Sequence, residues 1–69
     1  MKTYIVVTSD GRDEWVEYEG TNIKAAKRIA RIEYDRNEKA KQNYAVELRE
    51  MTDDYEPGSD NYNYNLIGY

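Results

Sequence analysis

Carboxylates are the side chains in this sequence that come closest to a reactive group, and they occur in two clusters. One cluster lies within residues 10–19 and the other within residues 53–60. Two carboxylates can share acid–base work when an apolar pocket raises the pKa of one of them. Both clusters fall on segments that we expect to be outer strand faces or loops, where water surrounds each acid. We therefore predict that the chain is not an enzyme.

Other reactive arrangements lack their partners. The sequence contains no histidine and no cysteine, so Ser9 and Ser59 have no imidazole base to activate a hydroxyl. The four glycines are scattered and form no phosphate cradle. Asp53, Asp54 and Glu56 come nearest to a metal-binding set, but their spacing is not that of a calcium loop. We expect no catalytic residue, no cofactor and no metal site.

Charge is divided unevenly along the chain. Residues 21–43 hold seven basic and three acidic side chains, whereas the remainder holds three basic and eleven acidic ones. The total formal charge is −4. This distribution predicts a bipolar molecule with one basic surface and one acidic surface. Such a field steers a protein toward charged partners.

The acidic segments and the tyrosines form the preferred candidate for a partner-binding surface. Carboxylates can contact a basic protein surface, including one that normally holds nucleic acid. Tyrosine and tryptophan are the usual anchors of interfaces, and the chain has eight tyrosines and one tryptophan. Two structural alternatives stay open: the acids serve solubility only, or Tyr4 and Trp15 pack with the terminal tyrosines on the open face of a sheet. The candidate residues are Asp13, Glu14, Trp15, Glu17, Glu19, Asp53, Asp54, Tyr55, Glu56, Tyr62 and Tyr64.

The basic segment offers a second hypothesis, direct binding of nucleic acid. Lysine and arginine neutralise phosphates, and nearby tyrosines can stack on bases. The opposing interpretation is an ordinary solvated helix face, which fits the low pI of ≈ 4.7. The residues concerned are Lys24, Lys27, Arg28 and Arg31.

These surfaces are positioned by one amphipathic helix, predicted over residues 21–36. At about 100° per residue, an apolar arc faces one side and the basic residues face the other. Thr21 or Asn22 can cap the first turn, and residues 38–41 can add one more turn at the end. The apolar arc consists of Ile23, Ala26, Ala30 and Tyr34, widened by Ala25, Ile29 and Ile32.

An antiparallel hairpin is predicted before the helix. Residues 3–8 form a β-branched apolar run and residues 14–19 alternate, with Asp10-Gly11 supplying the turn between them. We expect one face of this hairpin to lie under the helix and the other to stay open. The inward set is Ile5, Val7, Val16 and Tyr18, and the outward set is Tyr4, Val6, Trp15, Glu17 and Glu19.

The second half of the chain completes a small sheet. Residues 44–51 read as a third strand with Tyr44, Val46 and Leu48 directed inward. Residues 52–61 read as an exposed acidic loop, and residues 62–69 as an edge strand or a mobile tail that orders on a partner. The predicted fold is a single α+β domain over residues 1–69, with a small antiparallel sheet of three or four strands and one helix packed on one face.

The layout of residues 3–51 resembles small phage-encoded proteins that disable host machinery. The stretches KTYIVVTSDGRDEWVEYEG, NIKAAKRIARIEYDR and YAVELRE carry this resemblance. Anti-CRISPR proteins and a phage inhibitor of bacterial RNA polymerase are examples of the class. The resemblance implies stoichiometric binding that blocks a large nucleic-acid-handling complex, without chemistry.

The functional hypothesis is therefore a non-enzymatic, protein-binding inhibitor of the phage type. We expect its partner to be a host protein or nucleoprotein complex. A direct nucleic-acid-binding accessory protein and a small dimeric structural or assembly subunit are the alternatives. No apolar run approaches the roughly 20 residues of a membrane span, and no signal peptide opens the chain. We expect no membrane contact and a cytoplasmic location, which is the host cytoplasm for a phage protein.

Overall fold

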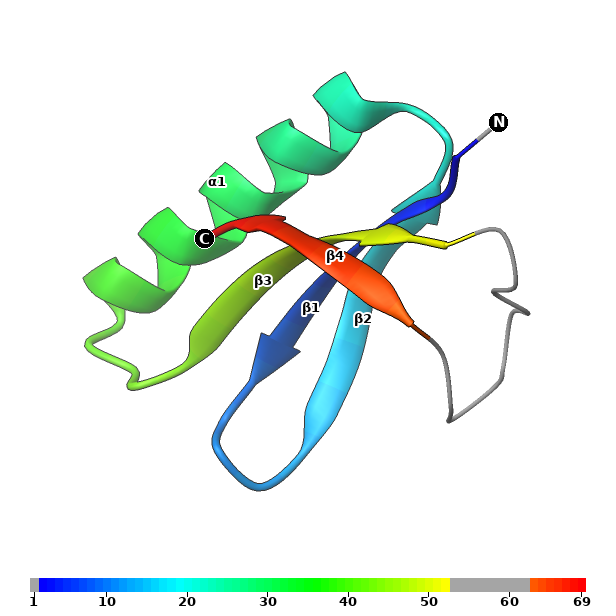
Figure 1. The fold of residues 1–69 in the computed structure, drawn as a ribbon. Coiled ribbons are helices and arrows are strands. Elements are labelled where there is room, and N and C mark those ends of the chain that lie inside the picture. The colour runs from blue at the N-terminus through cyan, green and yellow to red at the C-terminus, as the bar shows by residue number, and fades with distance from the viewer. Residues whose placement is uncertain (1, 53–62) are drawn as a thin grey trace.

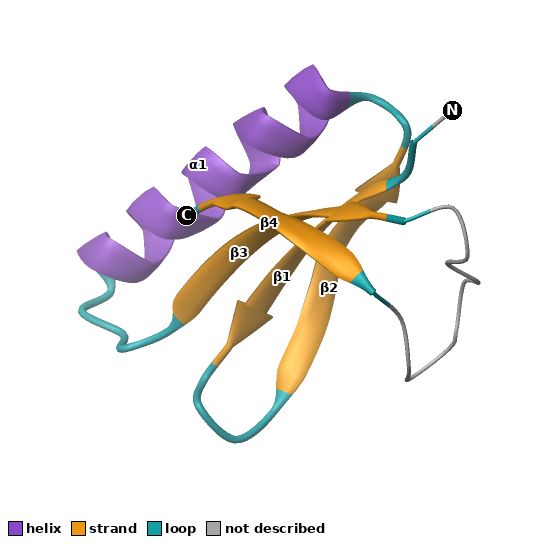
Figure 2. Cartoon of the chain, viewed as in Figure 1, coloured by secondary structure: helices purple, strands orange, loops and turns teal. Residues whose placement is uncertain are grey.

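One helix packs on one face of a four-stranded antiparallel sheet (Figures 1 and 2). The computed structural model describes residues 2–52 and 63–69. In chain order the elements are β1 (Tyr4–Ser9), β2 (Glu14–Gly20), α1 (Ile23–Lys39), β3 (Ala45–Met51) and β4 (Tyr64–Gly68). The strand order in the sheet is β2-β1-β3-β4. The predicted α+β fold class is confirmed, and the C-terminal segment is an edge strand.

The turn between β1 and β2 is held by Asp10. Its Oδ1 accepts hydrogen bonds from the backbone N–H of Asp13 (2.7 Å) and of Arg12 (2.9 Å). These bonds favour the ionised form and lower the pKa of the Asp10 carboxyl, the bond from Asp13 having the largest effect. Gly11 adopts a φ of 90°, a conformation in which a side chain would be strained. The Asp-Gly turn signal is therefore correct.

Both ends of α1 are closed by local hydrogen bonds. At the start, Asn22 Oδ1 accepts from the backbone N–H of Lys24 and of Ala25, so Asn22 and not Thr21 is the cap. At the end, the N–H of Gln42 donates to the carbonyl of Asn37, and Lys41 takes the left-handed conformation. The helix therefore continues to Lys39 and includes the first half of the additional turn, residues 38–41, that the sequence left open.

The helix lies on the face of β1 opposite to the predicted one. Val6 is fully buried with Ala26, Ala30 and Leu48 in the cluster between helix and sheet. Ile5 belongs to a separate cluster on the open face. The prediction was wrong because both faces of β1 are apolar, and a two-residue period cannot show which of them the helix covers.

A β-bulge explains a second wrong prediction for the hairpin, that Val16 and Tyr18 point to the same face. Val7 pairs with Val16 and Val6 pairs with Tyr18, so Glu17 is an additional residue in β2. The bulge places Val16 and Tyr18 on opposite faces, although both were predicted to point inward. Tyr18 packs against the cluster under the helix, whereas the Val16 side chain is 58% exposed.

The side of α1 that meets the sheet is more polar than predicted. Ala26 and Ala30 are buried as expected, but Tyr34 is exposed, and so is Ile32. Glu33 and Asn37 are buried in their place. They continue the line of Ala26 and Ala30 along the helix, because these positions are separated by three or four residues. The prediction failed here because it defined the buried arc by its apolar residues alone and left out the polar residues at the same angular position.

Thr8 lies on the helix face of β1, and its buried hydroxyl has no hydrogen-bond partner among residues 2–52 and 63–69. An unsatisfied buried hydroxyl costs about 1–3 kcal/mol. We therefore expect Thr8→Val to raise the free energy of unfolding by about 1 kcal/mol, measured by urea denaturation. Thr52→Val is the matched control, because Thr52 Oγ1 donates to the Asn63 carbonyl at 3.1 Å. This control should lower stability. A loss of stability in Thr8→Val would contradict the prediction.

On β3, Val46 and Leu48 point toward the helix as predicted. Tyr44 precedes the strand and stays outside this cluster, with 36% of its surface exposed. The opposite face of β3 contributes Met51 to the open-face cluster with Ile5 and Val7. The sheet therefore has an apolar centre on each of its two faces.

Candidate partner-binding surface

The acidic residues of the hairpin gather along one edge of the sheet. β2 is an edge strand, and its predicted partner-binding residues are all exposed or half-buried. Together they form the acidic edge, which consists of Asp13, Glu14, Trp15, Glu17 and Glu19. These five residues lie within residues 13–19 and share this edge of the sheet.

Trp15 is held in a defined orientation within the acidic edge. It pairs with Thr8 and therefore lies on the helix side of the sheet, not on the predicted open side. Its indole Nε1–H donates to Glu17 Oε1, and its ring meets the ring of Tyr44 edge-on, with centroids 5.5 Å apart. The side chain is still 36% exposed. Trp15 is therefore an ordered aromatic group that remains accessible to a partner.

Arg49 connects the acidic edge to the rest of the open face. Its Nη2 donates to Glu14 Oε2 at 3.1 Å and to Glu47 Oε1 at 2.8 Å. Its guanidinium carbon also lies 4.4 Å from the centre of the Tyr64 ring, a cation–π contact. One side chain of β3 therefore contacts β2 on one side and β4 on the other.

Arg49 keeps its positive charge although its side chain is buried. Only 8% of the side chain is exposed. Burial by itself lowers the pKa of a guanidinium, but the hydrogen bonds to Glu47 and Glu14 outweigh that effect and raise the pKa of Arg49. Sequence reasoning did not select this residue. A signal was present, because Arg49 is the only basic residue in residues 42–69 and a lone charge among acids needs a partner.

Tyr64 belongs to the predicted set but lies on the other edge strand, β4. Its contact with Arg49 places it on the open face, near the residue that also holds Glu14. The remaining predicted residues lie outside the described residues. These are Asp53, Asp54, Tyr55, Glu56 and Tyr62.

The alternative nucleic-acid-binding residues lie on the outer side of α1. Lys24, Lys27, Arg28 and Arg31 are all exposed. Arg31 pairs with Asp35 at 3.3 Å, which reduces its local charge. The basic residues therefore form a solvated surface, separate from the acidic edge.

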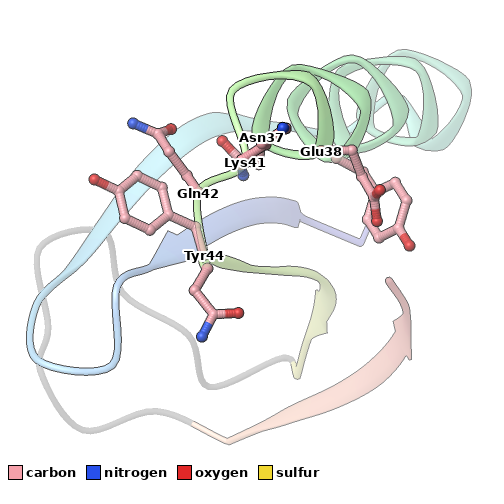
Figure 3. Close-up of a pocket in the computed structure, with 7 residues that line it drawn as sticks. Asn37, Glu38, Lys41, Gln42 and Tyr44 are labelled. Atoms are coloured by element: carbon pink, nitrogen blue, oxygen red, sulfur yellow. The ribbon is translucent and has the colours of Figure 1, made fainter.

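A hollow of about 430 Å³ lies at the C-terminal end of α1 (Figure 3). Among its labelled lining residues, Glu38 points to one side, whereas Gln42 and Tyr44 point to the other. Glu38 hydrogen-bonds the hydroxyl of Tyr34, and this bond is the main reason that the pKa of Tyr34 is raised.

Three searches of the chain gave negative results. Within residues 2–52 and 63–69, no group of three acidic, histidine or cysteine side chains is placed to hold a metal ion. In the same part of the chain, no helix is both long enough and apolar enough to cross a membrane. Searches against protein-family models, curated proteins and solved structures gave no match for this chain.

Proposed function

We propose that the protein is a non-enzymatic binding protein that attaches through the acidic edge to a basic surface of another protein. The observation that carries this proposal is the ordered Trp15 among the carboxylates of an edge strand. Tryptophan is enriched among residues that dominate binding energy, and surrounding charges steer encounter and select the partner. Trp15 is held by Glu17 and Tyr44, so less conformational freedom is lost when a partner covers it.

The mode of action that we propose is occlusion. A strip of carboxylates can occupy a basic groove that otherwise receives nucleic acid, because both present negative charge to the same cations. This is the mode implied by the resemblance to small phage-encoded inhibitors, including anti-CRISPR proteins. The target is accordingly a nucleic-acid-handling complex in the host cytoplasm.

Charge reversal tests which surface binds. Glu17→Lys together with Glu19→Lys reverses two charges on the acidic edge. We expect this variant to lose at least tenfold in affinity for the captured partner, a free-energy change of about 1.4 kcal/mol or more. The measurement is a pull-down from host lysate, with and without nuclease, followed by titration of the captured protein. A pull-down that yields no stable protein partner would overturn the proposal.

Two control variants accompany this experiment. Asp35→Lys with Glu38→Lys makes the same change in net charge on the exposed side of α1, and it should keep the partner. Lys24→Glu with Arg28→Glu tests the second candidate function. If this basic-face variant alone abolishes capture, and nuclease treatment also abolishes it, then the helix binds nucleic acid and the acidic edge is not the site.

Trp15 supplies a direct readout for the same titration. It is the only tryptophan in the chain, so intrinsic tryptophan fluorescence of the isolated protein comes from the acidic edge alone. A partner lacking tryptophan, or a tryptophan-free fragment of it, should change this emission on binding. An unchanged emission at saturation would place the contact elsewhere.

A further inference from the structure

The strand β4 lies in the longest uncharged segment of this highly charged chain. Residues 61–69 contain no acidic or basic side chain, although 35% of the whole chain is charged. β4 is also an edge of the sheet, and within the part of the chain that the structure describes no strand pairs with its outer side. Among the described residues, the outer backbone N–H and C=O groups of β4 therefore face no other strand, and no charged side chain of β4 protects them.

The opposite edge strand, β2, has features that protect it from pairing with another chain. β2 carries Glu14, Glu17 and Glu19 and contains the bulge at Glu17. Charges and bulges are the usual devices that prevent edge strands from pairing with other chains. β4 has one irregularity, at Ile67, and its residues 64–66 pair regularly with β3. The unprotected edge is therefore a specific feature of β4.

Large apolar side chains are exposed on both sides of β4. Leu66 is 61% exposed and lies on the open face, because it pairs with Arg49. Ile67 and Tyr69 are also exposed, and the Tyr69 ring approaches the Tyr34 ring of α1 with centroids 6.5 Å apart. In Figure 1 the C-terminus accordingly lies beside the helix. The exposed surface thus continues from β4 onto α1.

We propose that β4 is a homodimer interface, in which β4 of one chain pairs antiparallel with β4 of a second copy. The charge distribution selects this occupant. Two copies that each carry a charge of −4 repel one another, but an approach along β4 sets uncharged residues opposite uncharged residues in every register. A charged partner would find no opposite charge on this strand.

The area available is sufficient for such a dimer. The exposed large side chains are Tyr34, Tyr64, Leu66, Ile67 and Tyr69. At roughly 100 Å² each, complete burial of these side chains in two copies would cover about 1,000 Å², the size that a biological interface should clear. Pairing would join the two sheets through their β4 edges and leave both acidic edges at the outer ends.

The test is the oligomeric state, measured by sedimentation equilibrium over a series of protein concentrations. The wild-type chain should reach twice its mass of 8.2 kDa. Leu66→Lys should raise the dimer dissociation constant at least tenfold. Val16→Lys is the matched control, because Val16 is similarly exposed, lies on the other edge strand and gives the same net charge. This control should dimerise like the wild type.

Asn65→Lys gives a second variant on the other face of β4, and it should also weaken the dimer. Circular dichroism identifies any variant that fails to fold, and the remaining variant then decides the outcome. A wild-type chain that stays monomeric at every concentration would overturn the proposal. So would a dimer that Val16→Lys disrupts and Leu66→Lys does not. Partner capture plays no role in this test, so its outcome is independent of the proposed function.

Discussion

Replacing Arg49 with methionine should lower the free energy of unfolding by about 3 kcal/mol. The variant loses the hydrogen bonds to Glu14 and Glu47 and the cation–π contact with Tyr64. Removing one partner of a buried ion pair costs about 3–5 kcal/mol, and we take the lower value because both carboxylates still reach water. A domain of this size has only about 5 kcal/mol of stability in total. The measurement is equilibrium denaturation in urea.

Lys2→Met is the control for Arg49→Met. Lys2 also pairs with a carboxylate, Glu50, at 2.8 Å, but its side chain is 58% exposed. Exposed ion pairs contribute about 0–1 kcal/mol, so this variant should stay close to the wild type. If both substitutions cost the same, Arg49 acts only as a surface charge and does not connect the strands.

Leu48→Ala should destabilise the protein by about 3 kcal/mol, within the range of 2–5 kcal/mol for such truncations in cores. Leu48 is fully buried between β3 and α1, where the lost side chain would leave a cavity. Leu66→Ala removes the same atoms from the neighbouring strand β4, where the side chain is mostly exposed. It should change the stability of the monomer by less than about 0.5 kcal/mol.

Thermal and urea unfolding of the two leucine variants distinguish the two faces of the sheet. The measurement is made at a concentration where the chain is monomeric, so that any association through β4 does not contribute. Equal losses in Leu48→Ala and Leu66→Ala would contradict the assignment of Leu48 to the core between helix and sheet.

Local signals in the sequence were sufficient for the order of elements. Asp10-Gly11 identifies the turn because few other residue pairs adopt its backbone conformation, and Asn22 marks the start of the helix because its side chain can bond free amides. Such signals depend on residues that are close in sequence. They can therefore be recognised without knowledge of the tertiary structure.

The face of each strand and of the helix that is buried could not be predicted in the same way. Both sides of β1 are apolar, and the bulge at Glu17 depends on pairing with β1, which no local pattern records. The burial of Glu33 and Asn37 follows from where the helix rests on the sheet. Both are polar residues, so a rule based on hydrophobicity places them in solvent.

Only part of the candidate surface could be selected from the sequence. The residues of the acidic edge are close in sequence, within residues 13–19, whereas Arg49 joins Glu14 and Tyr64 across 35 and 15 positions of the chain. Contacts of this length arise only when the strands are assembled. The function of these surfaces stays a proposal, to be tested by the charge-reversal variants.

The strand order has a consequence for the way the chain folds. β1 pairs with β2 across a short turn, and it pairs with β3 across a connection that contains the whole helix. β4 contacts only β3 among the described elements. Contacts that close short loops form early, and those that close long loops form late. We therefore expect the β1–β2 hairpin to nucleate folding and the pairing of β1 with β3, which closes the longest loop, to form later. Because β4 is held by one neighbouring strand only, it should be the first strand to detach in native-state fluctuations, and the amides of residues 64–68 should exchange with solvent faster than those of β1.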